Sequence, residues 1–403
     1  MKQPQKAALA FIFITILLDV IGFGIIIPVI PLILKEFTGG DLSLASRYGG
    51  WLLFSFSLVQ FFSSPVLGSL SDRFGRRRVL LISLFGFGID YLFLAFAPGI
   101  GWLFLGRMIA GFTGGSITTA TAYIADISTA ENRGKNFGML GAAFGLGFII
   151  GPVLGGWLGE IGPRVPFLAA AGLSLLNWLY GFFILPESLA TEHRRPFEWK
   201  RSNPFSALLR LFADKNIGLL AFAVFFLHMA SHSVQSTWSY FTMGEYQWTS
   251  AQVGNSLGVV GLLVAIVQGG LIGKANRRLG IKGSVIAGLS LSALGLLIFS
   301  LASAPWILYA GLIPYCLSGV AGPSLQGFIS SKIPPDAQGE LQGALTSIIS
   351  LSAIAGPPMM TNLYATFSAA SAPVHFPGAA FALGMCFAML SLLICSSVFS
   401  SRR

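Results

Sequence analysis

The chain has 403 residues, of which 54% are hydrophobic and only 10% are charged, and its formal net charge is +10. Soluble globular proteins carry about 25% charged residues, so this composition excludes a soluble protein and indicates an all-α membrane protein. The basic residues lie between apolar segments rather than on one exposed face, which argues against nucleic-acid binding and for a role in membrane orientation.

Twelve segments are long and apolar enough to cross a bilayer as helices, because a span needs about 20 predominantly apolar residues. We predict these spans at residues 8–34, 46–68, 78–97, 101–124, 134–158, 165–185, 216–241, 250–273, 281–303, 305–329, 338–364 and 376–399. The long polar stretch after the sixth span divides the chain. We therefore predict an N-terminal six-helix bundle at 1–185, a cytoplasmic linker at 186–215 with a short amphipathic helix at 204–212, and a C-terminal six-helix bundle at 216–403.

The distribution of Lys and Arg predicts the orientation of the spans. Of the 25 Lys and Arg residues, 21 lie in the two termini and in the loops that join even to odd spans. Lys35, Arg47 and Arg164 lie in the opposite loops, and Arg107 lies within a span. By the positive-inside rule both termini are cytoplasmic, and so is the loop at 68–78, GSLSDRFGRRR.

The two halves of the chain are related by an internal repeat. A constant offset of 205 residues aligns 68–78 with 273–283, 123–138 with 328–343, and the pair Gly151-Pro152 with Gly356-Pro357. Such duplications are typical of transporters, which place the substrate near the bilayer midplane between repeats and expose it to each side in turn. Asp72 aligns with Arg277 and Asp126 with Ser331, so the halves have diverged.

Three charged residues lie deep inside predicted spans, away from the ends: Asp19, Asp90 and Arg107. A charge at the bilayer centre costs on the order of 3 kcal/mol, so each of them is a functional candidate. Counting along the helices at about 1.5 Å per residue puts all three at a similar depth. Two acids against one base leave a surplus carboxylate for proton coupling or cation recognition. The alternative, a buried ion pair that only orients helices, stays open.

The seventh span carries a polar stripe, His228, His232, Gln235 and Trp238, at helical spacing. Its possible roles are substrate contact, proton relay or hydrogen bonding between helices, and Gln60 in the second span is a further candidate for substrate contact. An HxxxH pair can bind a metal, but no third ligand is near it in sequence, so we expect no metal site. Cys316, Cys386 and Cys395 lie in apolar runs without a pairing pattern, and we expect no cofactor.

Several motifs resemble the major facilitator superfamily and, within it, the proton-coupled drug exporters, most closely the tetracycline exporters. Residues 68–78 fit the loop signature G-x-L-x-D-R-x-G-R-R-R at every defined position. The fifth span fits the antiporter signature G-x8-G-x3-G-P-x2-G-G with Gly138, Gly147, Gly151, Pro152, Gly155 and Gly156. The stretches LLDVIGFGIIIP, GIDYLFLAF and LFLGRMIAG are also similar to exporter sequences. The likeness runs through all twelve spans and is strongest up to about residue 157.

The resemblance implies roles for the loop signature. Asp72 is expected to act as a latch that faces the positive N-terminus of the eleventh span, and Arg73 and Arg77 are expected to pair with Asp126. These residues, with Gly68 and Gly75, would form a cytoplasmic gate.

The signature glycines and Pro152 are expected to allow close helix packing and bending during transport; a packing role without gating is the alternative. Tetracycline exporters usually carry a histidine in the eighth span and an aspartate in the ninth, where this chain has Val264 and Ser292.

Together these features predict a monomeric proton-coupled antiporter in a bacterial inner membrane that exports hydrophobic, drug-like compounds of the tetracycline or multidrug type. The alternative on the same fold is an uptake transporter for a nutrient or a siderophore-like molecule. A receptor or scaffold that transports nothing is a third possibility, and it predicts no effect of neutralising Asp19. Enzyme activity has no supporting motif.

Overall fold

The computed structural model describes residues 3–129, 131–197, 214–334 and 337–400, and the described chain is helical. The predicted amphipathic helix at 204–212 lies outside the described residues. By their contacts the residues group into two compact units: unit 1 draws on 1–33, 55–203 and 249–261, and unit 2 on 34–54, 204–248 and 262–403. Compared with the predicted bundles, unit 1 also includes residues 249–261, and unit 2 also includes residues 34–54. The predicted domain boundaries stay a prediction.

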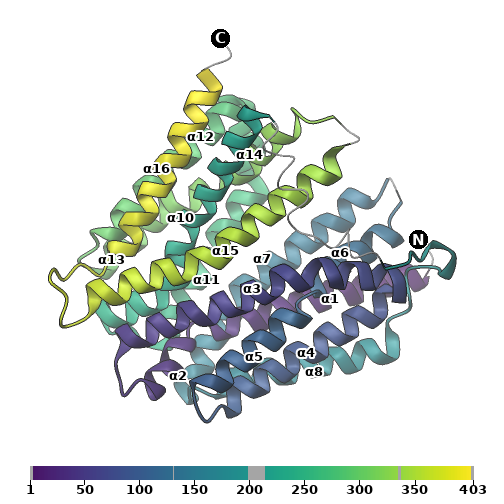
Figure 1. Ribbon diagram of the computed structural model, residues 1–403, viewed down its shortest axis with the longest axis horizontal. Helices are drawn as coiled ribbons and strands as arrows, with labels where there is room; N and C mark the ends of the chain where they lie inside the picture. Colours follow the sequence, from purple (N-terminus) through teal and green to yellow (C-terminus); the bar gives the residue numbers. More distant parts are fainter. Residues whose placement is uncertain (1–2, 130, 198–213, 335–336, 401–403) are drawn as a thin grey trace. The chain divides into compact units, whose positions relative to one another are not determined.

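Most helices of the first half of the sequence belong to unit 1 (Figure 1). Its helices include α1 (Gln3–Ile26), the second part of α3 (Leu42–Phe74), α4 (Arg76–Phe96), α5 (Ile100–Thr113), α6 (Ser116–Ile127), α7 (Arg133–Ile161), α8 (Val165–Ile184) and the first part of α11 (Ser250–Ile266). α1 packs against α7 and α8, and α4 packs against α5 and α8.

Unit 2 holds α10 (Lys215–Tyr246), the π-helical turn η3 (Val267–Leu271), α12 (Ile272–Ser300), α13 (Pro305–Leu317), η4 (Ser318–Val320), α14 (Ala321–Ser330), α15 (Gln338–Ser368) and α16 (Ala379–Ser400). The second half of the short helix α2 (Ile30–Phe37), the first part of α3 and the end of α11 also belong to it. The short turn η1 (Thr191–His193) follows α8 in unit 1. The core of unit 2 is an apolar cluster formed by α10, α12, α14, α15 and α16.

The predicted count of twelve spans is consistent with the helices, although ten helices qualify as candidate spans by length and hydropathy among the described residues. The fourth span is split into α5 and α6 at Gly114 and Gly115, so neither piece is long enough alone. The eighth and ninth spans are joined into one helical run of 51 residues, which Gly280 interrupts with a φ of 71°. The first span likewise breaks around Pro28, between α1 and α2.

Glycines of the antiporter signature let two faces of α7 pack closely against neighbouring helices. A Cβ added to Gly151 would lie 2.8 Å from the carbonyl oxygen of Ile21, and one at Gly155 would collide with the carbonyl of Ile25, both on α1. Gly156 faces α11, where its added Cβ would collide with the carbonyl of Ser250. Gly138 has nothing within 4 Å of such an atom. The helices can therefore approach closely because the signature supplies no side chain at these contacts.

This packing predicts different costs for alanine within one signature. Gly151→Ala and Gly155→Ala force α1 and α7 apart and should destabilise the protein by about 1–3 kcal/mol. Gly138→Ala should be neutral or stabilising by up to about 1 kcal/mol, because alanine favours a helix. Thermal unfolding in detergent measures the difference, with Gly141→Ala as control, since Gly141 also has open space around it. Equal losses at all four positions would contradict the packing account.

Candidate functional site

Unit 1 brings the three charges predicted inside spans into one buried cluster. Asp90 on α4 is fully buried and forms an ion pair with Arg107 on α5, which is only 5% exposed. Both carboxylate oxygens of Asp19 on α1 are buried, and no described residue gives either of them a hydrogen bond of good geometry. The Ser116 hydroxyl on α6 lies close enough to interact with Asp19, and the buried Tyr91 interacts electrostatically with all three charges.

This cluster contains more acid than base. The Arg107 guanidinium holds one oxygen of Asp90, and the other oxygen of Asp90 is buried without a partner among the described residues. Asp19 therefore remains a buried carboxylate with no ion pair in the described chain. An unpaired buried charge is costly, and binding a proton removes that cost. The cluster can therefore bind and release a proton, and this changes its net charge.

At the end of unit 1 formed by residues 68–78, here called the motif end, Arg76 is the central basic residue. Its guanidinium lies 2.5 Å from Asp72, 3.2 Å from Asp126 and 2.6 Å from the hydroxyl of Ser71. The expected pairing of Asp126 with Arg73 and Arg77 is therefore wrong. Because α4 begins at Arg76, this residue shares a buried face with Asp90, fourteen residues on, whereas the next residue points about 100° away.

The other residues of the loop signature bond to backbone groups, contact a neighbouring ring or shape the turn. Arg77 donates to the carbonyl of Phe182 at 2.6 Å, and the Arg73 guanidinium lies over the Phe74 ring. Gly75 adopts a φ of 99°, which favours glycine, where the chain turns from α3 into α4. Gly68 has open space around it. The latch role of Asp72 stays a prediction.

Glu187, three residues after the end of α8, was missed by the sequence reasoning. Its carboxylate accepts hydrogen bonds from the backbone N–H of Arg76 at 2.8 Å and of Arg77 at 3.3 Å, and so caps the N-terminus of α4. Gly75 precedes this helix without a capping side chain, which was the available signal that the cap comes from elsewhere. Ser188 adds a hydrogen bond to Asp126 at 3.0 Å. These hydrogen bonds of Glu187 and Ser188 hold the start of the predicted linker against the motif end.

At the opposite end of unit 1, a second carboxylate caps a helix. Glu160 on α7 accepts from the backbone N–H of Ala251 at 2.9 Å and from the hydroxyl of Ser250 at 2.8 Å. These bonds join the fifth predicted span to the eighth, next to the Gly156 contact. They tie the N-terminal and C-terminal halves of the sequence together at this end.

The residues predicted to contact substrate divide between both units. Gln60 on α3 donates to the carbonyl of Gly114 at 3.2 Å, at the break between α5 and α6. On α10, His228 lies 2.9 Å from the carbonyl of Val224, and His232 lies 3.5 Å from the Ser352 hydroxyl of α15.

The two remaining predicted contacts differ in exposure. Gln235 is exposed, whereas Trp238 is buried. Trp238 is 2% exposed and packs edge-on against Phe299 and Phe381, so we correct it to a core residue of unit 2.

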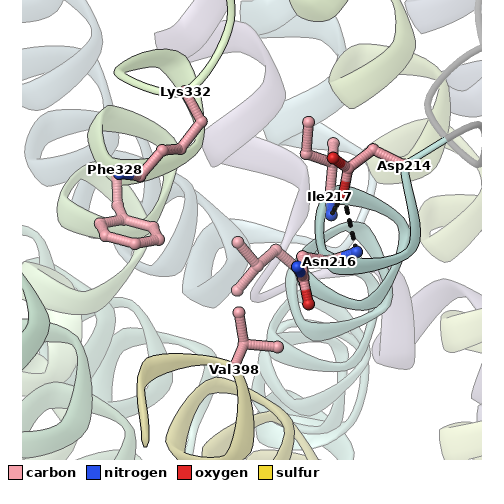
Figure 2. A pocket seen from close by; sticks show the side chains of 7 residues that line it. Asp214, Asn216, Ile217, Phe328, Lys332 and Val398 are labelled. Atoms are coloured by element: carbon pink, nitrogen blue, oxygen red, sulfur yellow. Dashed lines mark hydrogen bonds between the residues drawn. The ribbon is translucent and has the colours of Figure 1, made fainter. Parts of the chain in front are cut away.

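A small pocket of about 170 Å³ lies elsewhere in unit 2 (Figure 2). Its lining comes from the start of α10 and the residue before it, from α14 and the turn after it, and from α16, and includes Asp214, Phe328, Lys332 and Val398. Asp214 caps α10 by accepting from the backbone N–H groups of Asn216 and Ile217. None of the residues predicted to contact substrate lines this pocket, and we do not assign the transport site to it.

The Glu187 cap predicts a specific loss of stability. Glu187→Gln removes the charge that complements the helix N-terminus and should destabilise the motif end by about 1 kcal/mol, and Glu187→Ala by up to about 2 kcal/mol. The matched control is Glu131→Gln, which neutralises an exposed acid before α7. Thermal unfolding and transport rate are measured on the same preparations. If Glu187→Ala unfolds at the temperature of the control, the cap has no energetic role.

Comparison with known proteins identifies the family. The model of the Major Facilitator Superfamily matches residues 12–357. The class C tetracycline resistance protein of Escherichia coli is 40% identical over 90% of this chain and 91% of its own length. The class G protein of Vibrio anguillarum is 38% identical over 88% and 89%.

Solved structures agree on the fold. A human organic anion transporter superposes with a TM-score of 0.70 at 24% identity, covering 98% of this chain and all of its own. The nucleoside transporter NupG superposes with a TM-score of 0.77 at 14% identity, covering 98% and 99%. The chain therefore belongs to the Major Facilitator Superfamily, among the relatives of the tetracycline resistance proteins.

Proposed function

We propose that this protein is a proton-coupled antiporter of a bacterial inner membrane that exports hydrophobic, drug-like compounds by alternating access. The observation that carries the proposal is the buried cluster of Asp19, Asp90 and Arg107, in which one carboxylate exceeds the available positive charge. The relation to tetracycline resistance proteins supports export, and it makes tetracycline the first compound to test.

The exchange follows from the electrostatics of the cluster. Arg107 holds Asp90 in place as an ion pair, and Asp19 binds the transported proton. With the proton bound, the cluster is nearer to neutrality and the helices around it can change their solvent exposure at lower cost. Substrate enters from the cytoplasm or the inner leaflet, and release of the proton to the cytoplasm accompanies each substrate that leaves outward. Both termini are cytoplasmic in this topology.

Substrate contacts come from polar side chains that are half-buried or exposed rather than part of the apolar cores. We assign Gln60, His228, His232 and Gln235 to this role. Gln235 is exposed on α10, one helical turn from His232. His232 also packs against Gly356, where an added Cβ would lie 2.6 Å from its ring. This contact orients the imidazole between α10 and α15.

The direction of transport and its coupling are testable in inside-out vesicles. An imposed pH gradient, acidic inside, should drive tetracycline accumulation by the wild type, and Asp19→Asn and Asp90→Asn should reduce this accumulation to the level of vesicles without the protein. Substrate counterflow, which moves no net proton, should persist in Asp19→Asn.

The matched control is Asp41→Asn, because Asp41 caps the start of α3 through the N–H groups of Ser43 and Leu44 and asparagine caps equally well. Proton-driven movement out of these vesicles would support an uptake transporter instead. Undiminished accumulation by both variants would reject the proposal.

A further inference from the structure

Four helices of unit 1 enclose a common interior beneath the acidic cluster. α1 contacts α6 and α8, and α4 contacts the same two helices. Such a closed ring of contacts makes the inward faces of all four helices converge. Most of this interior is apolar, with Phe11, Ile12, Ile16 and Leu80 fully buried. Polar side chains inside it therefore need an explanation.

All four helices of the ring nevertheless carry buried polar side chains. Asn177 on α8 is 2% exposed and accepts a hydrogen bond from Thr15 on α1 at 3.4 Å, but its side-chain Nδ2 is buried without a partner among the described residues. The hydroxyls of Thr119 on α6 and Ser83 on α4 are equally buried and equally unpartnered. Each such group costs about 1–3 kcal/mol if nothing satisfies it.

These groups differ from ordinary buried hydroxyls in this chain. Helical Thr and Ser side chains usually bond to a carbonyl of the preceding turn, as Thr113 does with Ile109, Thr242 with Trp238 and Ser256 with Val253. Thr119 and Ser83 do not make this bond. Their hydroxyls are free to bond a group inside the ring instead.

The register of the helices arranges these groups between the acidic cluster and the motif end. Thr15 lies one turn below Asp19, about 6 Å along α1. Thr119 lies about 4.5 Å below Ser116 on α6. On α4, Asp90, Ser83 and Arg76 follow one another at intervals of seven residues, which places all three on one face. The polar groups thus lie at successive depths along the helices, between Asp19 and Asp90 at one end and Arg76 at the other.

We propose that the interior of this ring holds a file of water molecules that carries protons between the Asp19–Asp90 cluster and the motif end. Water satisfies buried polar groups that the protein leaves unpaired, and such sites need two or more polar partners, which the ring supplies. This inference rests on the proposed function, because it gives the transported proton its route to the cytoplasm.

Each transfer in the file conserves charge and atoms. The Asp19 carboxylic acid breaks its O–H bond and gives the proton to a water, and each following water or hydroxyl accepts one proton and donates another. Thr119 and Ser83 have hydroxyls that can do both, whereas Asn177 donates its N–H groups and only orients a water. At the motif end the last water gives its proton to cytoplasmic water beside Asp72, whose side chain is 44% exposed, while the Arg76 guanidinium stays protonated and holds Asp72 and Asp126 in place.

The test measures the rate at which purified wild type and variants release protons when tetracycline is added in a stopped-flow apparatus with a pH dye. Thr119→Val and Asn177→Leu replace the polar atoms by methyl groups, and Ser83→Ala removes the hydroxyl. Each should slow proton release roughly tenfold or more. Substrate counterflow should be unchanged. Thr119→Ser restores a hydroxyl and should restore the rate, which separates proton transfer from a folding defect.

Thr242→Val and Ser256→Ala are matched controls, since these hydroxyls are buried but already bonded to the backbone, and they should release protons at the wild-type rate. Wild-type rates in all three file variants would overturn the water file while leaving the proposed function intact. A wild type that binds tetracycline and releases no proton would overturn the proposed function and the file with it.

Discussion

The structure of unit 1 depends on burying two carboxylates against a single guanidinium. The pair of Asp90 and Arg107 fixes α4 against α5, and Asp19 brings a further carboxylate from α1, for which the described residues supply no base. A protein that needed only stability would gain little from this arrangement, because buried ion pairs rarely exceed hydrophobic packing and an unpaired acid costs free energy. The surplus acid makes sense in a transporter, where the gain of a proton changes which state is stable.

A second feature is that the starts of two helices are each capped by a carboxylate from a distant segment of the chain. Glu187 caps α4 at the motif end, and Glu160 caps α11 at the opposite end of unit 1. Each cap satisfies backbone N–H groups that a helix start leaves unpaired. Because α7 and α11 belong to different halves of the repeat, parting them during transport means releasing the Glu160 bonds and the close glycine contact beside them. The signature glycines and this acid therefore act on the same contact.

The spans, the family and the intramembrane charges could all be predicted from the sequence, because apolar length and the cost of buried charge are local properties. The placement of Arg76 could not, since one residue of uncertainty in the start of α4 rotates a side chain by about 100°. Glu187 was missed because its bonds cross 111 positions in sequence. Trp238 matched the spacing of a polar stripe, but spacing does not separate a cavity face from a face covered by Phe299 and Phe381.

The most direct measurement of the central claim is difference infrared spectroscopy of the purified protein, recorded before and after tetracycline binds. The account predicts that binding removes the carbonyl band of a protonated, buried carboxylic acid, and that this band is absent from Asp19→Asn. Binding of the compound by the wild type with no change in that band would contradict it.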